Sequence, residues 1–161
     1  MGKKELDRLK LNSIKYNTNL ALNWLVKSGI QNNDKNRPSH FGAFNAWYDV
    51  KNRKYSYMYS EITGYLITSM IFHYRLTQKK IYLNSAIKAA DWLIKNAQHK
   101  NGGFKCLFLI NKKLKFGDKE DYIYSFDNGV IINGLVNLYS TTKNYKYLNA
   151  AEKSANFLIL N

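Results

Sequence analysis

The chain has 161 residues, with 25 Lys and Arg against 11 Asp and Glu, a formal net charge of +14 and 45% hydrophobic residues. This length suits a single domain over residues 1–161 with a real hydrophobic core. The lysines are spread along the chain without a block of five or more, so the charge does not indicate a specific nucleic-acid interface. Cys106 is the only cysteine, which excludes an internal disulfide.

The first residues carry no signal peptide, and no continuous apolar run is long enough to span a membrane. We therefore expect a cytoplasmic protein without a membrane partner. No Cys/His cluster has the spacing of metal ligands, so we expect neither a metal nor another cofactor.

Apolar residues recur at helical spacing from about residue 6 to 28, where Leu9, Leu20, Trp24 and Leu25 fall on or near one face. A turn follows at residues 40–44, and an aromatic and basic stretch over residues 45–58 predicts a short β-hairpin.

The segment 61–76 is apolar nearly all round, which is typical of a helix buried on most sides. Residues 79–97 form an amphipathic helix, a turn follows at 101–104, and a second hairpin is predicted between 105 and 123, with its turn at residues 111–113. Segments 127–141 and 145–160 then repeat the buried and amphipathic characters.

The two helical pairs are related by a shift of 65 positions, which aligns residues 59–96 with 124–161 at 15 identities in 38 pairs. Residues 6–44 correspond to a further half repeat. Ser60 and Ser125 precede the buried helices at equivalent places and are expected to cap them. Gly64 and Gly129 are also equivalent, and we interpret both as sites of close helix packing rather than of backbone exposure to a ligand.

The motifs Tyr59–Tyr65, Ala90–Ile94, Asn101–Phe104 and Phe126–Gly129 resemble those of α/α-toroid proteins, and most closely the six-hairpin glycosidase-like superfamily. The resemblance implies an all-α fold, here a partial α/α toroid of about two and a half helical hairpins with small β-hairpins on one rim. It also implies a carbohydrate ligand. A full ring needs more repeats than this chain supplies, so we expect either a fragment of a longer chain or a homodimer.

The best candidates for chemistry are Glu61 and Asp127, which open the two buried helices. Glycoside hydrolysis needs one protonated and one ionised carboxyl group, and these two could face one cavity. A carboxylate in the first turn of a helix is also favoured by the helix dipole alone.

Aromatic side chains gather near these helix starts, and their rings could stack on the apolar faces of sugars. They could equally belong to a half-buried strand. The candidates for substrate binding are Trp47, Tyr48, Tyr59, Tyr65, Tyr122, Tyr124 and Asn128.

Three functions stay open. The first is a carbohydrate-active protein that binds or processes a polysaccharide, as a glycoside hydrolase or a uronic-acid epimerase-like enzyme. The second is a non-catalytic helical-repeat module, or a remnant, that acts through a partner chain. The third is a toroid of the terpene-cyclase or prenyltransferase type. The sequence does not decide whether the protein is an enzyme.

Overall fold

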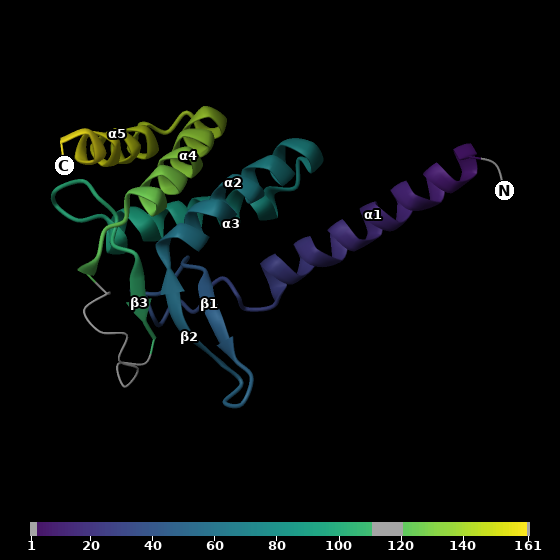
Figure 1. Cartoon of the computed structure of the whole chain (residues 1–161), viewed down its shortest axis with the longest axis horizontal. Coiled ribbons are helices and arrows are strands. Elements are labelled where there is room, and N and C mark those ends of the chain that lie inside the picture. Colours follow the sequence, from purple (N-terminus) through teal and green to yellow (C-terminus); the bar gives the residue numbers. More distant parts are fainter. Residues whose placement is uncertain (1–2, 111–120, 161) are drawn as a thin grey trace.

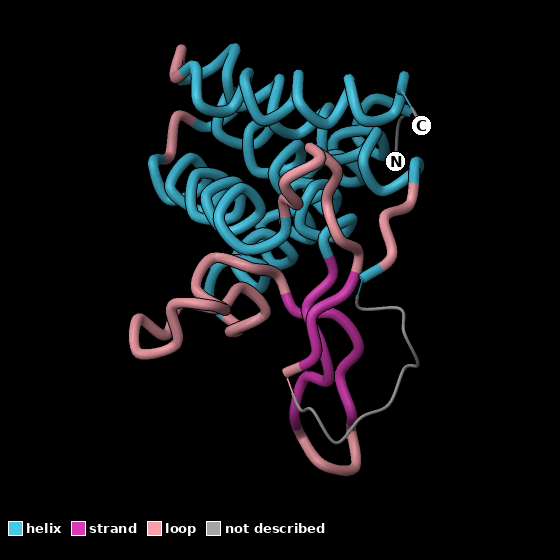
Figure 2. Tube along the Cα trace, turned by 90° about the vertical axis from the view of Figure 1, so that its left-hand side faces the viewer, coloured by secondary structure: helices cyan, strands magenta, loops and turns pink. Residues whose placement is uncertain are grey.

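The computed structural model describes residues 3–110 and 121–160. In this part of the chain, the helices after residue 59 form one body, and a small sheet extends from one end of it (Figures 1 and 2). The elements in chain order are α1 (Lys3–Lys27), β1 (Asn45–Asp49), β2 (Lys54–Tyr59), α2 (Ser60–Thr77), α3 (Lys80–Trp92), the π-helical η1 (Leu93–Ala97), β3 (Leu107–Leu109), α4 (Ser125–Thr142) and α5 (Tyr145–Leu160). The predicted alternation of buried and amphipathic helices is confirmed, and the helical hairpins form the expected partial α/α toroid.

Helices α2 and α4 are the inner pair and pack directly on each other. A Cβ added to Gly134 would lie 2.8 Å from the carbonyl oxygen of Gly64, so the two backbones approach closely where both residues are glycine. At the far end of the pair, the guanidinium of Arg75 donates to the hydroxyls of Ser140 (2.7 Å) and Thr141 (3.0 Å). The two helices therefore run side by side, with their N-termini at the end nearest the sheet (Figure 1).

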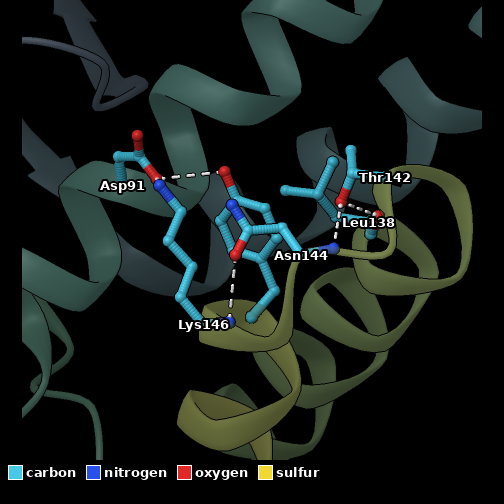
Figure 3. A network of polar contacts seen from close by, with 6 residues as sticks. Asp91, Leu138, Thr142, Asn144 and Lys146 are labelled. Atoms are coloured by element: carbon cyan, nitrogen blue, oxygen red, sulfur yellow. Dashed lines mark hydrogen bonds and ion pairs between the residues drawn. The ribbon is translucent and has the colours of Figure 1, made fainter.

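Helices α3 and α5 lie outside this pair and are joined by a polar network (Figure 3). Asp91 on α3 accepts a hydrogen bond from the Tyr147 hydroxyl (3.1 Å) and forms an ion pair with Lys146 (2.7 Å). The side chain of Asn144 caps α5 by accepting from the backbone N–H of Lys146 at 3.2 Å. These contacts join the two outer helices to each other.

The three strands form one antiparallel sheet in the order β1-β2-β3. The predicted hairpin over residues 45–58 is confirmed, with Tyr48 opposite Tyr55 and Ala46 opposite Tyr57. In the second stretch β3 pairs with β2, placing Tyr59 opposite Leu107, and the hairpin between 105 and 123 stays a prediction. Its predicted turn at residues 111–113 lies outside the described residues.

Helix α1 extends away from the rest of the molecule (Figure 1). Among its described side chains Leu22 is buried, whereas Leu20 and Trp24 are about half exposed, at 51% and 52%. The predicted apolar face is therefore only partly used for packing, because α1 meets the body only near its C-terminal end.

The loops that follow the outer helices repeat one arrangement. Gln31 donates to the carbonyls of Gly42 and Ser85, both at 2.9 Å, and Gln98 donates to those of Gly102 (3.0 Å) and Ala150 (2.9 Å). Each turn glycine has a positive φ, 99° and 100°, and a Cβ on either would overlap a backbone oxygen of the following outer helix. The loop of the half repeat at the start of the chain thus has the same arrangement as the loop of the full repeat.

Two details correct the sequence-based expectations. The helices are capped at Tyr59 and Tyr124, neither of which forms a side-chain capping bond, so Ser60 and Ser125 are the first helical residues. The Ser60 hydroxyl instead donates to the Lys105 carbonyl at 2.6 Å. This bond helps tie α2 to the chain entering β3.

The equivalent glycines also differ. A Cβ on Gly64 would meet Ile131 at 3.0 Å, but a Cβ on Gly129 would meet nothing within 4 Å. The packing interpretation is therefore confirmed for Gly64 and wrong for Gly129. The same contrast holds one turn or more along each helix, where Ile71 is 1% exposed and its counterpart Val136 is 41% exposed. In the described chain, α4 has no neighbour on the face that α2 uses to pack against α4.

Within residues 3–110 and 121–160, the helices are too short or too polar to cross a lipid bilayer.

Candidate active site

The two candidate carboxylates stand where the sheet meets the inner helices. Strand β2 ends at Tyr59 and continues directly into α2, so Glu61 lies in the first turn of that helix. Asp127 lies in the first turn of α4. Because α2 and α4 pack side by side in the same direction, the two helix starts are neighbours (Figure 1).

Asp127 is unusual for a carboxylate because it is almost completely buried, at 4% exposure. Its Oδ2 has no hydrogen-bond partner among the described residues. Buried polar atoms are normally satisfied, and an unpaired carboxylate oxygen is costly to keep in the interior. An unsatisfied oxygen at the mouth of two inner helices is therefore a feature that packing alone does not explain.

Burial raises the pKa of Asp127 from its ordinary value of 3.8 to about 6, and the negative charge of Glu61 adds to the rise. Hydrogen bonding to the Tyr59 hydroxyl opposes it. Removal from water also raises the pKa of Tyr59, and the Asp127 charge raises it further, so this phenol stays protonated and can donate. The pair therefore combines a carboxyl group that holds its proton near pH 6 with a second carboxylate close enough to influence it.

Two further groups surround Asp127. Removal from water, followed by the Asp127 charge, raises the pKa of the buried Cys106 thiol. Desolvation raises the pKa of Tyr124, with smaller contributions from Cys106 and Asp127. Cys106 is not among the residues that the sequence predicts for the site. The sequence around Cys106 does not reveal that this residue lies near Asp127, because its place depends on how the chain folds back onto β2 just before β3 begins.

The predicted substrate-binding aromatic residues lie in different places. Tyr59 and Tyr124 lie at the Asp127 carboxyl, and Tyr122 makes an edge contact with Tyr124 at 6.0 Å between ring centroids. Tyr65 is on α2 and is 49% exposed. Trp47 and Tyr48 instead line a groove with Trp24 of α1.

Asn128 has a scaffold role in this structure. It is fully buried, and its Oδ1 accepts hydrogen bonds from the Phe104 amide and the Ser154 hydroxyl, both at 2.8 Å. Its Nδ2 donates to the carbonyls of Phe104 (3.3 Å) and Tyr124 (2.8 Å). Since no polar atom is left for a sugar, we do not retain Asn128 as a substrate-binding residue.

The equivalent residue in the preceding repeat supports this reading of Asn128. Thr63 is also buried, and its hydroxyl accepts a hydrogen bond from the Phe44 amide at 3.3 Å. The described residues contain no group of three or more His, Cys, Asp or Glu side chains arranged to hold a metal ion.

Comparison with known proteins gives the family. The sequence model of glycosyl hydrolase family 76 matches residues 46–160. A search of curated protein sequences gives no significant match. One solved structure with the same fold is that of a family 76 glycoside hydrolase from a bovine Bacteroides thetaiotaomicron strain, at 22% identity and a TM-score of 0.61.

That similarity covers 72% of this chain and 25% of the solved chain, so the chain spans about a quarter of that enzyme's length. The family match supports the carbohydrate-related interpretation over the terpene-cyclase or prenyltransferase interpretation. Since the family model covers most of the sequence, including both inner helices, this chain belongs to glycosyl hydrolase family 76.

Proposed function

We propose that this chain is a glycan-processing unit in which Asp127 and Glu61 act as an acid and base pair. The observation that carries the proposal is the buried Asp127 carboxyl, whose Oδ2 is unsatisfied and whose pKa is raised to about 6. Family membership supports a carbohydrate as the ligand. Burial raises the pKa of Asp127, which suits this carboxyl to act as the acid of such a pair.

In a hydrolytic reaction, protonated Asp127 would donate its proton to the glycosidic oxygen as the bond to the sugar C1 breaks. Glu61, ionised, would either take a proton from the attacking water or attack C1 itself. In the first case Glu61 then releases its proton to solvent and Asp127 takes one up. In the second case Asp127 takes a proton from the water that hydrolyses the Glu61–C1 bond, which restores both carboxyl groups. The Tyr59 hydroxyl, which hydrogen-bonds Asp127, would orient the carboxyl toward the leaving oxygen.

The aromatic rings near the two helix starts supply a binding surface. Tyr59 and Tyr124 lie beside Asp127, with Tyr122 against Tyr124. Stacking of sugar C–H faces on such rings, with phenol hydroxyls as hydrogen-bond partners, would hold a sugar at the carboxyls. Tyr65, half exposed on α2, is a further candidate for this surface.

The decisive experiment measures release of reducing ends from a panel of purified polysaccharides, with Asp127→Asn and Glu61→Gln beside the unchanged chain. We expect each substitution to abolish turnover while circular dichroism shows an intact helical fold. Asp7→Asn, an exposed carboxylate on α1, is the matched control and should retain full activity. Full turnover by Asp127→Asn would remove the assignment. An epimerase-like reaction would instead exchange solvent deuterium into the polymer without releasing reducing ends.

A second candidate is a non-catalytic helical module that works through a partner chain. The observation that favours it is the face of α4 that the described residues leave uncovered, where a Cβ on Gly129 would meet no described atom within 4 Å and Val136 is 41% exposed. Light scattering separates the two candidates. A particle of twice the 18.8 kDa chain mass, without turnover of any polysaccharide, supports the module. A catalytically active monomer contradicts it.

A further inference from the structure

A groove of about 460 Å³ lies between the end of α1 and the β1-β2 hairpin. It is lined by Trp24, Ser28, Ile30, Asn45, Trp47, Tyr48 and Tyr55. None of these residues surrounds the Asp127 carboxyl, and the set contains four aromatic rings, polar groups and no charged side chain. A groove of this size matches a small-ligand site.

The rings in the groove are unusually accessible. Trp47 is 71% exposed, Trp24 52% and Tyr48 48%. Trp47 also has a φ of 48°, in the left-handed region that large side chains rarely adopt. Such backbone strain concentrates at functional sites. Packing in the hydrophobic core does not explain these exposed rings or the strained Trp47, because the core lies elsewhere.

The floor of the groove is rigid. The backbone N–H of Asn45 donates to the Ile30 carbonyl at 2.8 Å, and its side-chain amide donates to the Gly29 carbonyl at 3.3 Å. The Asn45 Oδ1 in turn accepts from the Asn32 amide at 2.8 Å. These bonds fix the chain leaving α1 against β1, so the two walls are held in place before any ligand arrives, which favours affinity.

A series of tyrosines connects the groove with the candidate carboxyls. Tyr48 and Tyr55 make an edge contact across β1 and β2, with ring centroids 5.0 Å apart. Tyr55, Tyr57 and Tyr59 alternate along β2 and so share one face of the sheet. Tyr57 contacts Tyr59, at 6.3 Å between centroids, and Tyr59 reaches Asp127. The span from Tyr55 to Tyr59 is about 13 Å at strand geometry.

We propose that this groove is a remote subsite for an extended neutral glycan, one segment of which stacks on Trp47 and Trp24 while another lies at Asp127. The inference rests on the proposed function and specifies its substrate as a chain of several sugar residues. Aromatic rings supply the stacking surface for sugar C–H faces, and the exposed Ser28 supplies a hydroxyl at its edge. The absence of a charged side chain among the lining residues argues for neutral rather than acidic sugars.

The test is direct binding of gluco-, manno- and xylo-oligosaccharides of two to six residues, measured by calorimetry and by tryptophan fluorescence. Trp47→Asn is the main variant, because Asn tolerates a positive φ and the fold should survive. Trp24→Ala changes an exposed helical position and serves as a second variant. We expect each to weaken binding of the six-residue chain by about tenfold, and binding of the two-residue chain by less. Tyr16→Ala, an equally exposed aromatic on α1, is the control and should bind as the unchanged chain does.

Equal binding by Trp47→Asn, Trp24→Ala and the unchanged chain would overturn the proposal, as would lack of binding across the whole panel. A concentration-dependent doubling of mass that both Trp variants abolish would instead identify a second protein copy in the groove, and would also overturn it. Asp127→Asn separates this proposal from the proposed function. If that variant keeps full turnover while Trp47→Asn loses affinity, the catalytic assignment fails and the subsite stands. If turnover depends on Asp127 but the Trp variants bind normally, the reverse holds.

Discussion

Replacing Asp127 by Asn should make the protein more stable at pH 7. The two side chains have nearly the same shape, but Asn has no charge to bury. In the folded chain the pKa of Asp127 is about 6, against an ordinary value of 3.8. The folded state therefore binds this proton more tightly than the unfolded state does. The contribution of Asp127 to the free energy of unfolding is therefore most favourable below about pH 4. It falls as the pH rises from about 4 to about 6 and is constant above.

The size of the effect follows from the same pKa difference. At about 1.4 kcal/mol per pH unit, ionised Asp127 lowers the free energy of unfolding by about 3 kcal/mol at pH 7. That figure is an upper limit for the gain in Asp127→Asn, because the new amide is itself polar and must also leave water. For a chain of this length it corresponds to a rise of about 6–12 °C in melting temperature. At pH 4 the unchanged protein carries a neutral carboxyl, so the two proteins should melt close together.

The measurement is thermal unfolding by circular dichroism at half-unit steps from pH 4 to pH 7.5. Asp7→Asn is the control, since Asp7 is an exposed carboxylate and should show no comparable dependence. A difference between Asp127→Asn and the unchanged protein that is the same at all pH values would refute the reasoning. So would destabilisation by Asp127→Asn at pH 7, since it would mean that the ionised carboxylate has a stabilising partner in the fold.

Two further predictions concern the site and the helix packing. In activity assays, kcat/KM should fall as the pH rises through about 6, and Tyr59→Phe should move this limb to higher pH, since the lost hydroxyl no longer favours the ionised carboxylate. An unshifted limb would show that Tyr59 does not act on Asp127. Gly64→Ala should lower the free energy of unfolding in urea by about 1–3 kcal/mol through overlap with Ile131. Its counterpart Gly129→Ala should raise it by up to about 1 kcal/mol, and effects of the same sign would contradict the observed difference in packing.

Much of the fold could be predicted from the sequence because the information is local and repeated. The 65-residue shift aligns residues that perform the same packing task, such as the buried Tyr82 and Tyr147, and apolar periodicity then separates inner from outer helices. The capping serines failed for a physical reason. Strand β2 runs directly into α2, so Tyr59 is the last extended residue and Ser60 already lies in the first helical turn. Its hydroxyl donates instead to the Lys105 carbonyl, 45 positions away in sequence.

The candidate site was predictable only in outline. Glu61 and Asp127 stand out as carboxylates at helix starts, but nothing near them in the sequence reveals the burial of Asp127, which depends on contacts made after folding. Asn128 follows Asp127 directly and looked equally suited to a ligand, yet its amide is used up by Phe104, Tyr124 and Ser154. The sequence groups Trp47 and Tyr48 with the same site, but in the structure they line a separate groove together with the end of α1.

The two repeats differ most informatively at the position of the proposed acid. The 65-residue shift aligns Asp127 with Ile62, a half-buried apolar residue that packs against the core. Packing at this place is therefore compatible with a hydrocarbon side chain, and the neighbouring Thr63 and Asn128 perform the same structural task in both repeats. A carboxylate at Asp127 lowers stability at neutral pH and leaves Oδ2 without a partner among the described residues. Since the fold does not require it, the cost is best explained by the chemistry of the site, and the stability gain expected for Asp127→Asn is the direct measure of that cost.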